Sequence, residues 1–218
     1  MSIAAAFEVS FFHQFVTSGG PIVWIILLPL SVASISLAVY YFVTVKRRRL
    51  VPEGIGKKIC STFRINGIGR GLDLLSREDD LVSRASVRVF SQKHTQLSRE
   101  ACRNLYIESL QENALELFRR IEWINIIGNI APMVGLFGTV FGMIKAFNKI
   151  VEAGGQPGPD ELAGGISVAL VTTFWGLLVA IPSIAVYGVF RNRVESLVSE
   201  AALEVEEIID NFEIEDLN

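Results

Sequence analysis

Three threonines are the side chains best placed to do chemistry, because each lies in a long stretch of sequence without charge. Thr139 lies in one such stretch, and the adjacent Thr172 and Thr173 lie in another. A hydroxyl in an apolar helix either bonds back to a carbonyl of its own helix or lines a polar passage. We expect at least one of the three to line a passage for ions, with backbonding as the alternative for any single threonine.

The chain itself brings no titratable group to such a passage. Its two histidines, His13 and His94, and its two cysteines, Cys60 and Cys102, all lie outside the uncharged stretches. There is no Walker A sequence, no metal-ligand spacing of His and Cys, and no Ser-His-Asp arrangement. We therefore expect no enzyme activity, cofactor or metal, and reduced, inert cysteines. If ions cross here, another polypeptide must supply the titratable group.

The uncharged stretches are long enough to cross a membrane. The 218-residue chain has a mean hydropathy of +0.43, and no Asp, Glu, Lys, Arg or His occurs in 22–45, 124–144 or 166–190. Each stretch supplies the roughly 20 apolar residues that cross a hydrocarbon core of about 30 Å. This excludes an ordinary soluble enzyme, a secreted disulfide scaffold and a nucleic-acid-binding module. We predict an all-α membrane protein with three transmembrane helices and long cytoplasmic helical extensions.

Small residues recur at helical spacing in the second and third stretches, a pattern typical of tight helix–helix contact. The first stretch instead carries bulky side chains that suit a lipid-facing helix, and the prolines are expected to bend or loosen their helices. The predicted packing and partner-facing residues are Gly128, Pro132, Gly135, Gly138 and Gly142 in the second stretch and Gly165, Ala169, Gly176, Ala180 and Pro182 in the third.

The positions of Lys and Arg predict the topology. None of the 20 precedes the first span, whereas sixteen lie between Lys46 and Arg120. Because short cytoplasmic loops collect these residues, we place this segment inside the cell. The predicted organisation is a periplasmic N-terminal segment (1–21), transmembrane helices (22–45, 123–147 and 165–190), a cytoplasmic helical domain (46–122), a periplasmic loop (148–164) and a cytoplasmic C-terminal helix (191–218).

Apolar periodicity predicts further helices outside the spans. Phe7, Phe11, Phe12 and Phe15 favour an amphipathic helix in the outer interface, with a frayed apolar terminus as the alternative. From Leu97 onward, the period continues without interruption into the second span and predicts one long helix. Breaks are expected at 52–54 and 66–69. The C-terminal segment has a heptad-type stripe: Val194, Val198, Ala201, Val205, Ile208 and Phe212.

Opposite charges predict that the two cytoplasmic segments pack together. Segment 46–122 carries 16 bases and 10 acids, a net charge of +6, whereas 191–218 carries two bases and nine acids, a net charge of −7. We expect contact between them within or between subunits, with a solvated acidic tail as the alternative.

Three blocks of sequence resemble the ExbB/TolQ branch of the MotA/TolQ/ExbB proton-channel family. They read GGPIVW at 19–24, APMVGLFGTVFGMI at 131–144, and LAGGIS at 162–167 followed by AIP at 180–182. The resemblance covers nearly the whole chain in order and spacing. The MotA branch fits less well, because its members are longer and have four spans.

The resemblance implies a pentameric ring in the bacterial inner membrane, with the second and third helices around a cavity and the first helix outside. It also implies that a dimer of a single-span ExbD- or TolR-like partner fills the cavity and supplies a membrane Asp. Proton or sodium flow would then drive work on a periplasmic or outer-membrane client, such as a TonB- or TolA-like protein. The alternative function is a membrane scaffold that keeps the ring but does not conduct.

One position departs from the family pattern. Many relatives have Glu early in the third span, in a Gly-Ile-x-Glu-Ala-Leu pattern, whereas here 165–170 reads GISVAL and Val168 takes that place. Thr139 and Thr173, the threonines of the pattern, are both present. The difference bears on the ion and its pathway rather than on assembly. The alternatives are sodium use, a proton relay through the partner Asp and water, and a poorly conducting channel.

Overall fold

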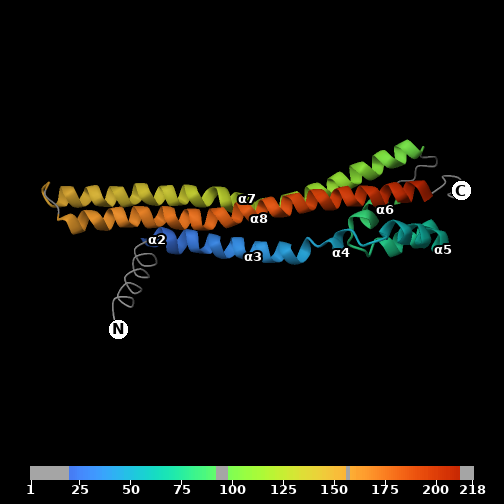
Figure 1. The fold of residues 1–218 in the computed structure, drawn as a ribbon, viewed down its shortest axis with the longest axis horizontal. Coiled ribbons are helices and arrows are strands. Elements are labelled where there is room, and N and C mark those ends of the chain that lie inside the picture. The colour runs from blue at the N-terminus through green and yellow to red at the C-terminus, as the bar shows by residue number, and fades with distance from the viewer. Residues whose placement is uncertain (1–19, 92–97, 156–157, 212–218) are drawn as a thin grey trace, which may run out of the picture. The chain divides into compact units, whose positions relative to one another are not determined.

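The computed structural model describes residues 20–91, 98–155 and 158–211, and every regular element in these ranges is a helix (Figure 1). The helices are α2 (Gly20–Ile22), the π-helix η2 (Val23–Leu27), α3 (Leu28–Thr44), α4 (Arg47–Leu50), α5 (Ile55–Leu75), α6 (Leu81–Ser91), α7 (Arg99–Glu152) and α8 (Pro159–Asn211). Three helical segments are long and apolar enough to cross a membrane: Gly20–Thr44, Arg99–Glu152 and Leu162–Asn211. The all-α prediction with three candidate spans is confirmed.

The chain divides into two compact units. The first unit comprises 1–39 and 122–187, and the second comprises 40–121 and 188–218. The predicted interfacial helix at Phe7 to Phe15, and Phe212 of the predicted stripe, lie outside the described residues. Within the first unit, the yellow part of α7 and the orange part of α8 run side by side (Figure 1).

The first candidate span begins with a change of helical type. In η2 the amide of Leu28 donates to the carbonyl of Val23, five residues back. Pro29 follows at once, and its missing N–H cannot bond to the carbonyl of Ile25. The regular α-helical hydrogen-bond pattern is therefore interrupted at this proline, and a single π turn occupies the interruption.

A small apolar cluster joins this helix to α7 and α8 in the first unit. Its buried members are Val23, Leu27, Ile127, Ala131, Val179 and Ala180. Beside it, the buried hydroxyls of Ser34 and Ser183 share a hydrogen bond of 2.6 Å. Such a bond satisfies two polar groups where water is scarce. Val32, Ile35 and Val39 leave a bulky apolar face of α3 exposed.

Both long helices are continuous. α7 has 54 residues, which confirms the prediction of one helix from the region of Leu97 through the second span. α8 has 53 residues and joins the third span to the C-terminal segment. Pro132 and Pro182 lie inside these helices without ending them. α7 ends at 152 and α8 begins at 159, so the connection between the two helices is shorter than the predicted loop 148–164.

The second unit is built around α5 and α6. Gly67, with φ 70° and ψ 170°, interrupts α5 within the predicted break at 66–69. Asp80 caps the start of α6, because its Oδ1 accepts the Ser83 amide at 2.7 Å. At the centre, the fully buried Tyr106 hydroxyl donates to Ser86 Oγ at 3.0 Å. Burial raises the pKa of this phenol, so it remains a neutral donor.

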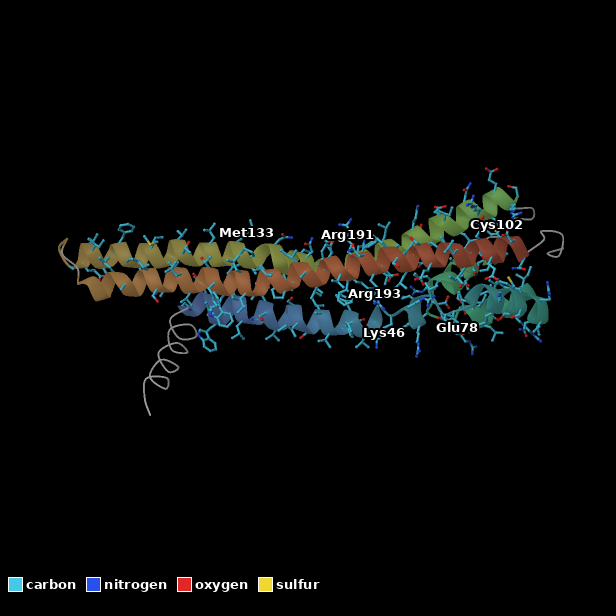
Figure 2. The ribbon with its side chains drawn as sticks, viewed as in Figure 1. Lys46, Glu78, Cys102, Met133, Arg191 and Arg193 are labelled. Carbon is cyan, nitrogen blue, oxygen red and sulfur yellow. The ribbon has the colours of Figure 1, made fainter. Side chains whose placement is uncertain are left out.

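The predicted contact between the oppositely charged segments is confirmed within one chain. The ion pairs between them are Arg47–Glu200 (2.7 Å), Lys57–Glu207 (3.6 Å), Arg103–Glu206 (3.2 Å) and Arg99–Asp210. Glu204 also accepts the Gly56 amide at 2.9 Å. Figure 2 shows Arg193 on the side of α8 opposite Arg191, where its Nε donates to the carbonyl of Val45 at 3.0 Å.

These ion pairs are largely exposed, so each contributes about 0–1 kcal/mol. The main stabilisation of the second unit comes from the apolar stripe beneath them. The buried stripe positions of α8 are Val194, Leu197, Ala201, Val205 and Ile208. Leu197 therefore takes the place that the sequence pattern gave to Val198.

The two cysteines lie in the second unit as free, partly buried thiols. Burial raises the pKa of both Cys60 and Cys102, and nearby Glu207 adds to the effect at Cys60. A raised pKa reduces the thiolate fraction at neutral pH, and the thiolate is the reactive form.

Two isoleucines of α5 test where the stability of this unit comes from. Ile59 is fully buried, whereas Ile65 is 80% exposed. We expect Ile59→Ala to lower the thermal unfolding midpoint of the detergent-solubilised protein by about 5–10 °C, because it leaves a cavity. Ile65→Ala should leave the midpoint nearly unchanged, and equal effects of the two changes would contradict this account.

Candidate functional site

The candidate site lies on α7 and α8 of the first unit, whose backbones meet through glycines. A Cβ on Gly135 would lie 3.0 Å from the carbonyl oxygen of Thr172, and one on Gly176 would lie 2.8 Å from that of Ala131. Ordinary contact begins at 3.4 Å, so a side chain at either position would push the helices apart. Small residues here allow the close approach that holds helices together in a membrane.

The contact continues toward both ends of the pair. A Cβ on Gly128 would lie 2.7 Å from Cγ1 of Ile184, and one on Gly165 would lie 2.6 Å from the Cβ of Ala146. A Cβ on Gly142 would lie 2.8 Å from the carbonyl oxygen of Gly165. The predicted small residues thus bring together two helices of the same chain.

The remaining predicted packing residues differ in their environment. Ala169 and Ala180 are buried, Pro132 is partly buried and Pro182 is exposed. A Cβ on Gly138 would overlap the Thr172 side chain. That any of these residues faces a partner helix stays a prediction.

Thr172 lies inside the helix pair. Its side chain is fully buried, and its Oγ1 donates to the carbonyl of Ala169 at 2.9 Å. This hydrogen bond to a carbonyl of the same helix is the alternative that we kept for each single threonine. An ion-pathway role for Thr172 stays a prediction.

Thr173 and Thr139 lie at the margin of the pair, and both are partly buried. Thr173 Oγ1 is 3.5 Å from the Gly135 carbonyl and 3.4 Å from the Ala169 carbonyl, long distances for a hydroxyl hydrogen bond. Its hydroxyl is therefore weakly held and available to another group. Thr139 donates to the Leu136 carbonyl at 2.7 Å, which leaves its oxygen able to accept.

Val168 lies near the start of the first candidate span. Its Cγ1 lies 4.0 Å from the point where a Cβ on Gly20 would be. An apolar side chain thus occupies the position at which many relatives of the resembled branch carry Glu. The sequence stretches 124–144 and 166–190 contain no Asp, Glu, Lys, Arg or His. Within the described residues, no group of three or more His, Cys, Asp or Glu could hold a metal ion.

The sequence analysis missed a line of polar side chains at one end of this pair. Asn125 donates to Glu122 Oε1 at 2.7 Å, and Asn129 donates to Asn125 Oδ1 at 3.0 Å. Tyr187 reaches from α8 and donates to Glu122 Oε2 at 3.0 Å. We call these four residues the polar ladder. The spacing of three and then four between Glu122, Asn125 and Asn129 could have shown that they share a helix face.

Adjacent glycines of α8 test the close contact. We expect Gly165→Ala to destabilise the protein by about 1–3 kcal/mol, because its new methyl group would overlap Ala146. Gly164→Ala is the matched control, since nothing lies within 4 Å of its added Cβ. Thermal unfolding in detergent micelles should separate the two variants, and equal midpoints would refute the contact.

Comparison with known proteins agrees with this architecture. The sequence model described as the MotA/TolQ/ExbB proton channel family matches residues 76–202. Biopolymer transport protein exbB1 of Vibrio cholerae is 40% identical over 76 residues, which are 35% of this chain and 33% of that protein. Biopolymer transport protein ExbB of Neisseria meningitidis is 29% identical over 192 residues, which cover 81% of this chain and 84% of that protein.

A solved structure shares the fold. The C. jejuni MotAB structure matches 99% of this chain and 89% of the matched chain, with a TM-score of 0.54 and 21% sequence identity. The family match extends over more than half of the sequence and includes most of α7 and α8 with their glycine contacts. The chain therefore belongs to the MotA/TolQ/ExbB proton channel family.

Proposed function

We propose that the chain is an ion-channel subunit, with protons as the expected ion, in an ExbB/TolQ-type motor of the bacterial inner membrane. The observation that carries this proposal is the α7–α8 pair. Its spans have no carboxylate, and Thr173 keeps a weakly held hydroxyl at the margin of the pair. A passage of this kind needs a titratable group from another polypeptide.

A single-span ExbD- or TolR-like partner with a membrane Asp would supply that group. In this proposal Thr139 and Thr173 face the Asp and hold water or the ion beside it. The burial of such a carboxylate disfavours its charged form, so it can alternate between protonated and ionised states. Relatives named as biopolymer transport proteins support the choice of a transport motor over an enzyme.

The assembly belongs to the same proposal. Five copies would form a ring with α7 and α8 around the partner dimer and α3 outside. The exposed face of α3, with Val32 at 56% and Ile35 at 62%, suits contact with lipid. The excess of Lys and Arg in 46–122 supports a cytoplasmic location for that segment and for the C-terminus, with the N-terminus in the periplasm.

The available energy is sufficient for mechanical work. One elementary charge that crosses 100 mV releases about 2.3 kcal/mol, so a few ions can drive a modest conformational step. The recipient would be a periplasmic or outer-membrane client of the TonB or TolA kind.

A non-conducting scaffold is the second candidate. It is favoured by the apolar side chain of Val168, which takes the position where many relatives have Glu. A scaffold would keep the helical ring and bind its clients without ion flux.

Thr173→Val tests the pathway. We expect ion flux into vesicles that contain the chain and its co-expressed partner to fall about tenfold or more, because the variant keeps the shape of the side chain but loses the hydroxyl. Thr44→Val is the matched control, since its exposed hydroxyl bonds to the Tyr40 carbonyl of its own helix at 2.9 Å. Unchanged flux in Thr173→Val would reject the pathway, and background flux in the wild type would favour the scaffold.

A further inference from the structure

The first candidate span is followed by a turn with four consecutive basic residues, which we call the basic turn: Lys46, Arg47, Arg48 and Arg49. All four side chains are exposed, and Figure 2 shows Lys46 at the junction of α3 and α4. The 25 residues of the candidate span extend for about 37 Å at 1.5 Å per residue, whereas the hydrocarbon core is about 30 Å thick. The basic turn therefore lies at the level of the lipid headgroups.

Hydrogen bonds hold the backbone of the basic turn in one conformation. The Val45 carbonyl accepts Nε of Arg193 from α8 at 3.0 Å. The Lys46 carbonyl accepts the amides of Arg49 and Leu50, each at 3.0 Å, which closes the single turn of α4. The side chains of Val45 and Leu50 are buried on either side of this turn. The basic side chains thus project from a fixed backbone.

Carboxylates already neutralise two of the four charges. Arg47 donates to Glu200 at 2.7 Å and to Glu53 at 2.9 Å. Arg49 donates to Asp79 at 3.3 Å. These two arginines therefore join the basic turn to its own unit and are not available to a ligand.

The other two charges, on Lys46 and Arg48, are open. Within residues 20–91, 98–155 and 158–211, neither side chain forms an ion pair. Helical residues two positions apart differ by about 200° around the axis, so Arg48 lies on the side of α4 opposite the buried Leu50. Its guanidinium consequently points away from the protein.

Exposed apolar side chains precede the open charges by only a few residues. Phe42 is 72% exposed and Val43 is 56% exposed at the end of α3. A surface that changes from apolar to positively charged over one helical turn matches a phospholipid with a negative headgroup. Its acyl chain can cover the apolar part, while its phosphate meets the charges. A free phosphate ion would use the charges and leave the apolar part uncovered.

The rule that places Lys and Arg on the cytoplasmic side does not by itself account for this arrangement. That rule depends on the number of Lys and Arg near a span, and acidic residues contribute little to it. It does not require that Arg47 and Arg49 be paired while Arg48, between them, stays open. It also does not require a fixed backbone beneath the charges.

We propose that Lys46 and Arg48, together with Phe42 and Val43, bind one anionic phospholipid at the end of the first span. The phosphate lies between the ammonium and guanidinium groups, and the guanidinium can donate two parallel hydrogen bonds to it. One acyl chain lies along the two apolar side chains. In the proposed ring α3 is outside, so this surface faces lipid. Placement in the inner leaflet rests on the proposed topology, whereas the binding does not depend on ion conduction.

Native mass spectrometry of the full chain in a neutral detergent tests the site. The probes are a phosphatidylglycerol and a phosphatidylcholine with the same acyl chains. We expect the phosphatidylglycerol to bind about thirtyfold more tightly, because each Lys or Arg near an anionic lipid contributes about fivefold. The double variant Lys46→Gln, Arg48→Gln should lose this preference. Phe42→Ala should weaken both lipids about threefold and leave the preference unchanged.

The matched control is the double variant Arg64→Gln, Arg70→Gln. It removes the same two charges from exposed positions of α5, away from the end of the first span. Its preference for phosphatidylglycerol should equal that of the wild type. Equal losses in the two double variants would show that only the net charge matters, and would overturn the site.

Three further results would also overturn the lipid site. The first is a preference that persists in the Lys46→Gln, Arg48→Gln variant. The second is displacement of the lipid by excess inorganic phosphate, which would assign the charges to a free anion. The third applies if the double variant does not fold: Arg48→Gln alone should lower the preference about fivefold, and an unchanged preference would reject the site.

The binding measurement requires no ion flux, so this inference and the proposed function can fail separately. Loss of the lipid preference together with normal flux in vesicles would leave the channel function standing. Background flux in the wild type would reject the channel function and leave the lipid site standing.

Discussion

The close backbone contact between α7 and α8 is the constraint on which the first unit depends. Lipid chains are as apolar as leucine, so the hydrophobic effect does not hold helices together inside a bilayer. Van der Waals contact must do so instead, and it needs surfaces that approach within a few ångströms. Gly135 and Gly176 permit that approach, and the same approach buries Thr172 while leaving Thr173 at the margin. Packing and site geometry therefore have a single cause.

The second unit is stabilised by a different interaction. Its core residues, such as Ile59 and Val205, are buried away from water, which makes the hydrophobic effect the main favourable term. The ion pairs between its basic and acidic segments are exposed, so salt screens them and each adds little. Their main effect is to select which surfaces meet. The opposite net charges of the two segments disfavour pairing of either segment with its own kind.

Much of this fold could be predicted from the sequence, because it follows from periodicity and charge. The spans, the long α7 helix, the break at Gly67 and the contact of basic with acidic segments all leave regular patterns. The site could be predicted less fully. Thr172 and Thr173 are neighbours that differ by about 100° around the helix, and only the actual contact with α7 decides which is buried. The bond from Tyr187 to Glu122 joins residues 65 positions apart, so no local pattern reveals it.

The single π turn before Pro29 changes how the first candidate span must be analysed. A π turn holds one more residue than the regular α repeat allows, so side chains before and after it are out of phase by about 100°. A helical wheel drawn through the whole segment would therefore misplace the face of Gly20–Ile22 relative to that of Leu28–Thr44.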